Sequence, residues 1–303
     1  MTQQVNVRRL LEQGQAAQDR EHDALEVTKR GNLRGGSAGV IGTDSKIYGE
    51  CHRVALARLL GADKEHDGNR SIMFDAGNAS EDSWAAKLKA AGLQFLREDE
   101  IPIVWPIPGT ARIATGRPDI VLGYYKDGSA EASDFVPEHG LELKGIYSAS
   151  SGLRVEVEGV PDPKHLAQAG FYAMALNIPY TLCYTNPSVI DVPYWAQKKL
   201  SAPKKLQPFY RLFELRWTDV LEYRDEMRDD WVRTVYTKQG IADYFALIVE
   251  QEQTKELGPR PEGGYATGEP LPYNKCNYCN FKDACSQYDA DADYDGWLAL
   301  IKS

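Results

Sequence analysis

The chain has 303 residues, of which 43% are hydrophobic and 26% charged, and its formal net charge is −9. This length and composition predict a globular protein with a sizeable core, and the negative charge counts against a protein that coats nucleic acid by bulk electrostatics. Because no apolar run reaches membrane-spanning length and no signal-peptide region follows Met1, we expect a cytoplasmic protein.

The first half of the chain predicts helices followed by strands. Residues 3–30 are expected to form a polar helix, and residues 31–48, which are rich in Gly and Ser, a loop. Glycines end two further helices, and a turn signal separates the last two of three strands. In chain order these helices and strands are Cys51–Leu60, Phe74–Ala91, Phe95–Val104, Arg112–Tyr125 and Gly140–Tyr147.

The second half continues the pattern after an ambiguous stretch at residues 148–161. Asp162 as a cap and Pro163 at the first helical position predict a helix that runs to Leu176. Two strands and a long helical stretch broken at Gly240 follow, and their expected ranges are Tyr180–Tyr184, Phe209–Trp217 and 218–256. Helices on either side of a central mixed β-sheet define an α/β fold class.

Two short apolar runs are each interrupted by an acidic residue, at Asp119 and at Glu142. Because side chains alternate along a strand, Glu142 and Lys144 project from one face while Leu141 and Leu143 enter the core. A neighbouring strand would place Asp119 beside Glu142. Two carboxylates and one ammonium suit magnesium-dependent phosphodiester hydrolysis, whereas the plain alternative is a set of strand-edge charges with a salt bridge.

Pro118-Asp119 followed by Glu142-x-Lys144 resembles the core motif of the PD-(D/E)xK nuclease superfamily. Gln168 and Tyr172, which share one face of the next helix, match the Gln-x3-Tyr of its RecB-type members. The resemblance implies a restriction-endonuclease-like core in which this pair contacts nucleic acid or braces the active site. Simple packing is the other interpretation of Gln168 and Tyr172.

The resemblance also assigns roles around the motif. It implies that Asp119, Glu142, Glu81 and the Leu143 carbonyl bind Mg2+ or Mn2+, while Lys144 orients the hydrolytic water. Glu81 stands where many relatives carry His, and its alternative is a solvated helix residue.

Five cysteines in a chain expected in the cytoplasm argue against a disulfide framework, and Cys276-x2-Cys279-x5-Cys285 has ligand spacing. An early Cys51 together with this late group resembles the iron–sulfur branch of the same nucleases, which includes CRISPR-associated exonucleases. The resemblance implies a 4Fe–4S cluster on these four thiolates, with zinc as the alternative that a ligand count leaves open. Cys183, in an apolar strand, is expected to be a buried core residue.

Three regions follow from this interpretation: a helical extension at 1–47, a nuclease core at 48–257, and a cysteine-bearing tail at 258–303. We expect the tail to pack back on the helix near residue 51. Candidate nucleic-acid contacts share a basic character and proximity to the motif: Arg117, Arg154, Lys164 and His165. Further candidates are two lysine pairs and three aromatic residues, which could equally be surface and core groups: Lys198-Lys199, Lys204-Lys205, Tyr147, Tyr194 and Trp195.

The sequence therefore predicts a metal-dependent DNA nuclease, an exonuclease acting on single-stranded ends, with a structural iron–sulfur cluster. Its partners would be DNA and proteins of a recombination or CRISPR-type complex. The alternative is a DNA-end-binding adaptor of such a complex with weak or no turnover. A third interpretation is a zinc-stapled structural protein whose charged strands are incidental.

Overall fold

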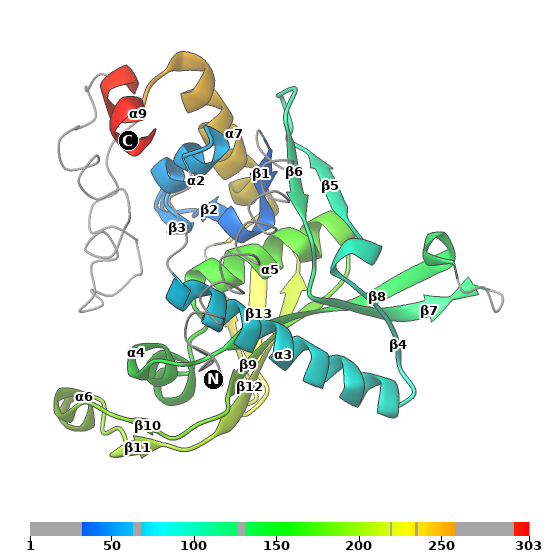
Figure 1. Cartoon of the computed structure of the whole chain (residues 1–303), viewed down its shortest axis with the longest axis vertical. Coiled ribbons are helices and arrows are strands. Elements are labelled where there is room, and N and C mark those ends of the chain that lie inside the picture. Colours follow the sequence, from blue (N-terminus) through cyan, green and yellow to red (C-terminus); the bar gives the residue numbers. More distant parts are fainter. Residues whose placement is uncertain are drawn as a thin grey trace, which may run out of the picture.

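The computed structural model describes residues 32–62, 68–126, 131–218, 220–233, 236–257 and 294–302. Its centre is a seven-stranded mixed sheet in the order β14-β13-β12-β9-β8-β7-β4 (Figure 1). Neighbouring strands are antiparallel except β8 and β9, which run parallel. The strands are β4 (Gln94–Arg97), β7 (Ile120–Tyr125), β8 (Phe135–Gly145), β9 (Tyr180–Asn186), β12 (Phe209–Trp217), β13 (Leu221–Asp225) and β14 (Asp230–Arg233).

Helices cover both faces of this sheet, which confirms the expected α/β class. Helix α5 (Pro163–Leu176) lies against β8, β9 and β12, while α3 (Gly68–Ala90) contacts β8 from the other face. The start of α5 was predicted correctly: the Asp162 carboxylate accepts a hydrogen bond from Lys164 N, and Pro163 occupies the first turn.

The alternation of side chains along β8 sorts its polar and apolar residues, as expected. Leu141 and Leu143 pack with Ile120 and Cys183 in a small core beneath α3. Glu142 and Lys144 therefore point to the opposite face, toward α5. The expectation that Cys183 is a buried strand residue is confirmed.

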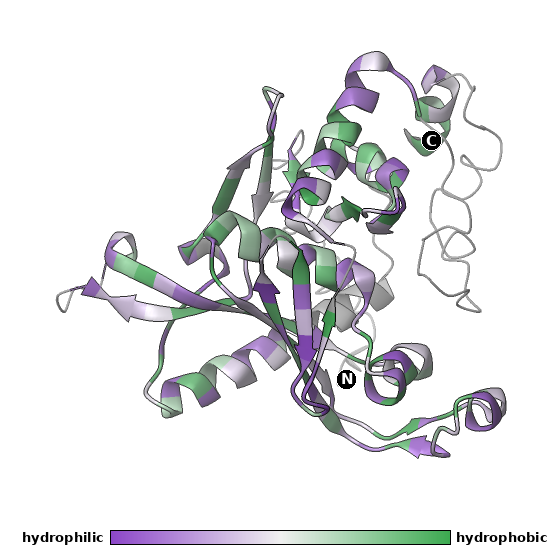
Figure 2. Cartoon of the chain, turned by 180° about the vertical axis from the view of Figure 1, so that it is seen from behind, coloured by the Kyte–Doolittle hydropathy of each residue, from purple (hydrophilic) through white to green (hydrophobic). Residues whose placement is uncertain are grey.

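The main core lies between the sheet and a group of helices beyond α5. This group contains α2 (His52–Leu59), α7 (Lys238–Thr254) and the C-terminal α9 (Tyr294–Lys302). Hydrophobic residues recur along α5 and α7 (Figure 2), and Trp297 of α9 is fully buried in the same core. Among the described helices, none combines the length and apolar character needed to cross a membrane.

Residues 31–48 were expected to be a loop, and this was wrong. They contain β1 (Leu33–Arg34) and the hairpin of β2 (Gly39–Ile41) with β3 (Ile47–Gly49). Gly39 in this hairpin serves close packing: a Cβ on it would lie 2.4 Å from the Tyr244 ring. Strand β1 pairs with β6 (Ile113–Gly116), which also pairs with β5 (Ile103–Pro106) in a separate three-stranded sheet.

Two of the expected strands are each divided between two sheets. Phe95–Val104 divides into β4 and β5, because Glu98 adopts φ +30° and turns the chain. Arg112–Tyr125 divides into β6 and β7 around Pro118, which has no N–H to donate to a strand ladder. Asp119 is consequently the last residue before β7.

The long helix expected over residues 218–256 was also wrong in its first half. Residues 221–233 form β13 and β14, which extend the central sheet by pairing with β12 and with each other. The helix of this region, α7, begins after Thr237, whose hydroxyl accepts a hydrogen bond from Gly240 N. Gly240 therefore lies in the first turn of α7 and does not break it.

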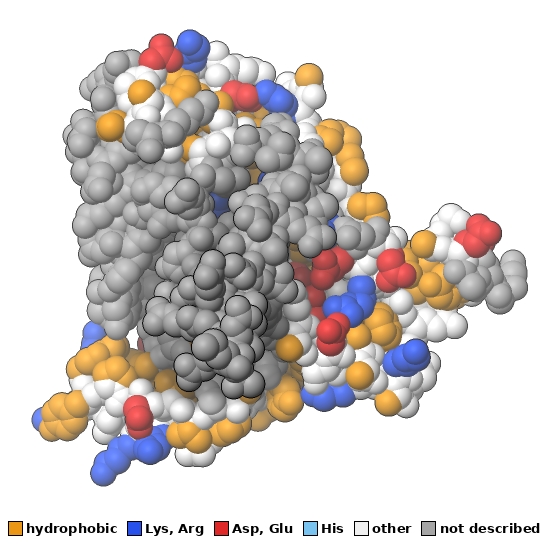
Figure 3. Space-filling view, viewed as in Figure 1, with side chains coloured by type: hydrophobic (Ala, Val, Ile, Leu, Met, Phe, Trp, Pro, Cys, Tyr) orange, Lys and Arg blue, Asp and Glu red, His pale blue; other side chains and the backbone are white. Residues whose placement is uncertain are grey.

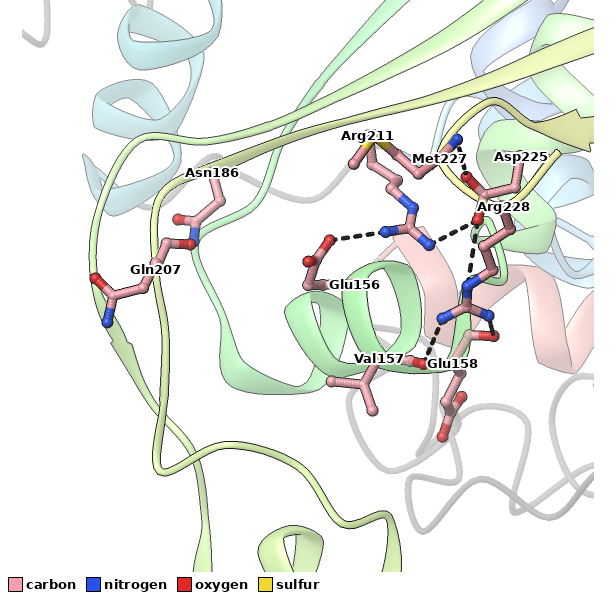
Figure 4. Close-up of polar contacts among 9 residues, drawn as sticks. All are labelled: Glu156, Val157, Glu158, Asn186, Gln207, Arg211, Asp225, Met227 and Arg228. Carbon is pink, nitrogen blue, oxygen red and sulfur yellow. Dashed lines mark hydrogen bonds and ion pairs between the residues drawn. The ribbon is translucent and has the colours of Figure 1, made fainter.

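The ambiguous residues 148–161 form a short α4 (Ala149–Gly152) and a π-helical segment at Leu153–Glu158. Arg228, after β13, donates hydrogen bonds to the carbonyls of Val157 and Glu158 (Figure 4). These bonds satisfy acceptors at the end of the segment. Between β9 and β12 the chain also forms three elements that were not expected: β10 (Ile190–Asp191), α6 (Tyr194–Lys199) and β11 (Lys205–Leu206).

Candidate active site

Asp119, Glu142 and Lys144 meet at one end of β7 and β8. Because Ile120 pairs with Leu141 in antiparallel register, Asp119 lies across from Glu142. Lys144 Nζ is 2.5 Å from Glu142 Oε1 and 4.0 Å from Asp119 Oδ2. The Asp119 carboxylate is held in place by a 2.7 Å hydrogen bond from Leu143 N. The structure thus brings the three motif residues together on one face.

These groups carry more buried negative charge than positive charge. Glu142 is 0% exposed, and burial together with the charge of Asp119 raises its pKa to about 8. Burial also raises the pKa of Asp119. Burial alone would lower the pKa of Lys144, but the charges of Glu142 and Asp119 outweigh it and the pKa is raised. Lys144 is therefore held as an ammonium.

Glu81 of α3 lies near enough to this cluster for the charge of Asp119 to act on it. Burial, followed by the charges of Asp119 and Glu98, raises the pKa of Glu81 to about 7. The charge of Glu81 in turn raises the pKa of Glu142. Arg97 Nη2 lies 3.6 Å from Glu81 Oε2 and is the nearby cation on this side.

Glu98 is an acidic neighbour that sequence reasoning missed. Its charge raises the pKa of both Glu81 and Asp119. Its own N–H donates to the carbonyl of Pro118, so the turn at Glu98 is tied to the chain just before Asp119. The available signal was the acidic run at 98–100, which was absorbed into an expected strand.

Gln168 and Tyr172 form one wall of the site from α5. Gln168 Nε2 donates to Tyr172 Oη over 3.3 Å. A Cβ on Gly35 or on Gly116 would lie 2.4 Å from Tyr172 Cε1, so both glycines make room for the ring. Burial and then the charge of Glu142 raise the pKa of Tyr172, and its phenol stays protonated.

Of the four basic residues proposed to contact nucleic acid, Arg117 borders the carboxylates. Its Nη1 is 4.0 Å from Glu98 Oε2, and its side chain is partly exposed. Arg154 is 9% exposed and lies in the π-helical segment, which removes it from an open surface. Lys164 pairs with the buried Glu50 at 2.8 Å, and His165 Nδ1 is 3.0 Å from Tyr184 Oη.

Two buried carboxylate oxygens at this site, Glu142 Oε2 and Glu81 Oε2, have no hydrogen-bond partner. Such oxygens are costly to bury unless a cation or a donor reaches them, as Arg97 Nη2 does for Glu81 Oε2 at 3.6 Å. In the described ranges, no three His, Cys, Asp or Glu side chains already surround a common metal position. Lys144 stands between Asp119 and Glu142 and acts as their counter-charge.

Cys51 is the described member of the expected cluster ligands. It caps the start of α2 and is half-buried at the edge of the main core. Cys276, Cys279 and Cys285 lie outside the described residues. Two residues that flank this group in sequence, Leu257 and Tyr294, are both buried in the core that contains α2.

No protein-family model matches this chain, and no curated protein matches it. Among solved structures, the chain is similar to the crystal structure of an alkaline exonuclease (LHK-Exo) from Laribacter hongkongensis. The TM-score is 0.35 with 12% sequence identity, over 77% of this chain and 96% of that chain. A likeness this distant carries no argument about function, which has to rest on the site itself.

Proposed function

We propose that this chain is a metal-dependent nuclease that hydrolyses the phosphodiester bonds of DNA. The observation that carries the proposal is the convergence of Asp119 and Glu142 on Lys144, at a site where the buried Glu142 Oε2 has no hydrogen-bond partner. Carboxylates in such surroundings favour binding of a hard divalent cation.

The residues that would hold the cation are Asp119, Glu142 and Glu81, together with the carbonyl of Leu143. The fit is chemical: all are oxygen donors, and Glu142 Oε2 and Glu81 Oε2 lack hydrogen-bond partners. When bound, Mg2+ or Mn2+ supplies Lewis-acid polarisation of the phosphate and a lower pKa for its water. A cation at this position would take over the counter-charge role of Lys144.

The protein's own groups would position and stabilise the reacting phosphate. Lys144, held as an ammonium by its carboxylate neighbours, would donate to the attacking water and stabilise negative charge on the phosphate oxygens. Its raised pKa makes it a poor general base. The Leu143 N–H fixes the Asp119 carboxylate, and Tyr172 with Gln168 fixes the wall beside Glu142.

The finer parts of the proposal come from the motif resemblance. They are exonuclease action on single-stranded DNA ends and a 4Fe–4S cluster on Cys51, Cys276, Cys279 and Cys285. Support for the cluster is that Leu257 and Tyr294, the described residues on either side of the late cysteines, are both buried in the core that contains α2. Tyr294 follows Cys285 by nine positions. A chain segment of that length spans at most about 30 Å.

The decisive experiment is digestion of labelled single- and double-stranded DNA with free or blocked ends, with Mn2+ or Mg2+ and with chelator. We expect metal-dependent cleavage that falls by about 10²–10⁴-fold in Lys144→Ala. Lys126→Ala, which removes an exposed lysine at the end of β7, should cleave like the wild type. Metal-independent DNA binding without cleavage would overturn the proposal in favour of an adaptor.

A further inference from the structure

Residues 187–208 form an arm that leaves the central sheet between β9 and β12. Strands β10 and β11 pair within it, and α6 lies at its far end (Figure 1). The arm has a small core of its own, made of Val192, Ala196, Ala202 and Leu206 packed against Leu153 of the π-helical segment. Gln197 Nε2 donates to the carbonyl of Val192 at 2.8 Å. The arm is therefore a folded element and not a loose loop.

The arm has the opposite charge to the protein as a whole. It carries four lysines (Lys198, Lys199, Lys204 and Lys205) and one acidic residue, Asp191, on a chain whose formal net charge is −9. Asp191 neutralises part of this charge by pairing with Lys205 at 3.6 Å, where both side chains remain largely exposed. A local surplus of three positive charges on an acidic protein favours a polyanionic partner.

Two aromatic side chains stand beside these lysines and are open to solvent. Tyr194 is 68% exposed and Trp195 is 43% exposed, so neither packs in the core. Lys198 Nζ lies 4.8 Å from the centre of the Tyr194 ring. Figure 3 shows hydrophobic and basic side chains gathered over this end of the arm. Exposed rings interleaved with lysines are the combination that binds the bases and the phosphates of an unpaired strand.

The arm starts at the end of the sheet that carries the candidate active site. Because β8 and β9 run parallel, Lys144 lies beside Tyr184, and β9 ends two residues later at Asn186, where the arm begins. Asn186 Nδ2 donates to the carbonyl of Gln207, which joins the two roots of the arm (Figure 4). A nucleic-acid strand bound along the arm would consequently lead toward the end of β8 that carries Glu142 and Lys144.

We propose that the α6–β11 end of this arm is a binding site for single-stranded nucleic acid, with Lys198, Lys199, Lys204 and Lys205 on phosphates and Tyr194 and Trp195 stacked on bases. The purpose of this binding rests on the proposed nuclease function, but the binding itself can be measured without turnover. A duplex keeps its bases stacked internally, so the rings favour an unpaired strand. Helix α6, with six residues, offers little apolar surface for insertion into a membrane.

The test is fluorescence anisotropy of labelled oligodeoxythymidylate in chelator, at several salt concentrations. Changing all four arm lysines to Ala should weaken binding at least tenfold and reduce the salt slope by roughly one for each phosphate that no longer pairs with a lysine. The matched control changes four exposed lysines elsewhere, Lys46, Lys126, Lys238 and Lys255, to Ala and should keep most of the affinity. This control separates a local site from the effect of net charge.

Replacing the rings tests the stacking part of the site. Tyr194→Leu with Trp195→Leu keeps the arm apolar but removes both π-faces, so binding of the oligonucleotide should fall about fivefold or more. Equal loss in the two lysine variants, no loss in the ring variant, or tighter binding to anionic phospholipid vesicles than to the oligonucleotide would overturn the arm proposal. If the arm variants lose binding of the oligonucleotide and the wild type does not cleave DNA, the arm proposal is supported and the nuclease proposal is wrong.

Discussion

At the scale of single residues, the candidate site is defined by a surplus of buried carboxylate. Glu81, Asp119 and Glu142 each have a raised pKa, and burial is the first cause in each case. Lys144 and Arg97 are the cations set against them. Such a cluster costs folding free energy that is recovered when a cation binds, which is a common arrangement at functional sites.

This surplus predicts how stability depends on pH in the absence of metal. Glu142 has a pKa of about 8 in the folded protein and about 4.5 as a model group, so the folded state holds the proton that the unfolded state loses. Stability from this group is full below about pH 4.5 and is lost as pH rises through 8. In chelator, the wild type should therefore lose more stability between pH 5 and pH 8 than Glu142→Gln, by on the order of 1–3 kcal/mol.

Urea unfolding of both proteins at the two pH values measures this difference. Glu138→Gln, at an exposed position of the same strand, is the control and should follow the wild type. Adding Mn2+ should restore the stability of the wild type at pH 8 more than at pH 5, because cation binding must displace protons from Glu142 and Glu81. Parallel pH profiles for wild type and Glu142→Gln would show that burial of this carboxyl costs nothing.

The packing of Tyr172 gives a second prediction, from two adjacent glycines. A Cβ on Gly35 would lie 2.4 Å from Tyr172 Cε1, whereas a Cβ on Gly36 would meet nothing within 4 Å. We expect Gly35→Ala to lower the free energy of unfolding by roughly 1–3 kcal/mol, while Gly36→Ala stays within about 0.5 kcal/mol of the wild type. Chemical denaturation checks this, and equal effects of the two changes would contradict the close approach of the ring.

What the sequence revealed at this scale depended on local periodicity. The positions of Asp119, Glu142 and Lys144 on one face follow from strand alternation and a single pairing, both of which leave a trace in the sequence. Glu98 could not be found in this way, because its approach to Glu81 depends on a turn at positive φ. Arg154 gave the opposite error: a basic residue in a polar stretch was expected at the surface and is buried.

At the scale of elements, residues that cap or end helices were the local signals that predicted helix boundaries correctly. Asp162 with Pro163 located the start of α5, and Gly61 follows α2 closely. The signals that failed concern strands whose existence depends on a partner. Residues 221–233 carry charges at helix-like spacing, yet they are strands because β12 offers an edge to pair with. Pairing across the sheet overrides local propensity there.

Arg211 forms ion pairs that link β12 to β13 and to the π-helical segment, and these pairs give an element-scale prediction. Arg211 of β12 pairs with Asp225 of β13 at 2.6 Å and with Glu156 at 3.2 Å, and its side chain and that of Asp225 are 6% and 3% exposed (Figure 4). Arg211→Met should destabilise the protein by roughly 3 kcal/mol, because Asp225 stays buried with Arg228 as a more distant partner at 3.7 Å.

The double variant Arg211→Met with Asp225→Leu should recover most of that loss, since it removes the uncompensated charge. Arg216→Met is the matched control on the same strand: the Arg216 side chain is 60% exposed in its pair with Glu214, and the change should alter the free energy of unfolding by less than about 0.5 kcal/mol. Urea unfolding of these variants and the wild type gives the comparison. A double variant less stable than Arg211→Met would contradict the argument from an orphaned charge.

At the scale of the whole molecule, the two ends of the described chain meet in one core. Leu33 and Val40, near its beginning, are buried in the same cluster as Trp297 and Ile301, near its end. Helix α9 is also tied to the end of α7, where Lys255 Nζ lies 3.6 Å from Asp295 Oδ1. Leu257 and Tyr294, the described residues on either side of the late cysteines, are thus both buried in this core, which also contains residues of α2.

Because both described flanks share this core, we predict that the late cysteines and Cys51 act as one metal-binding unit that stabilises the whole fold. Cys285→Ser and Cys51→Ser should each lose iron and labile sulfide and lower the melting temperature by several degrees, because a metal that closes a long loop restricts the unfolded chain. Cys183→Ser changes a buried cysteine outside the set and should keep its iron even though it is destabilised. Metal and sulfide analysis of anaerobically purified protein, with thermal unfolding, makes the comparison. Zinc without sulfide in the wild type would replace the iron–sulfur assignment, and full metal content in Cys51→Ser would separate the start of α2 from the site.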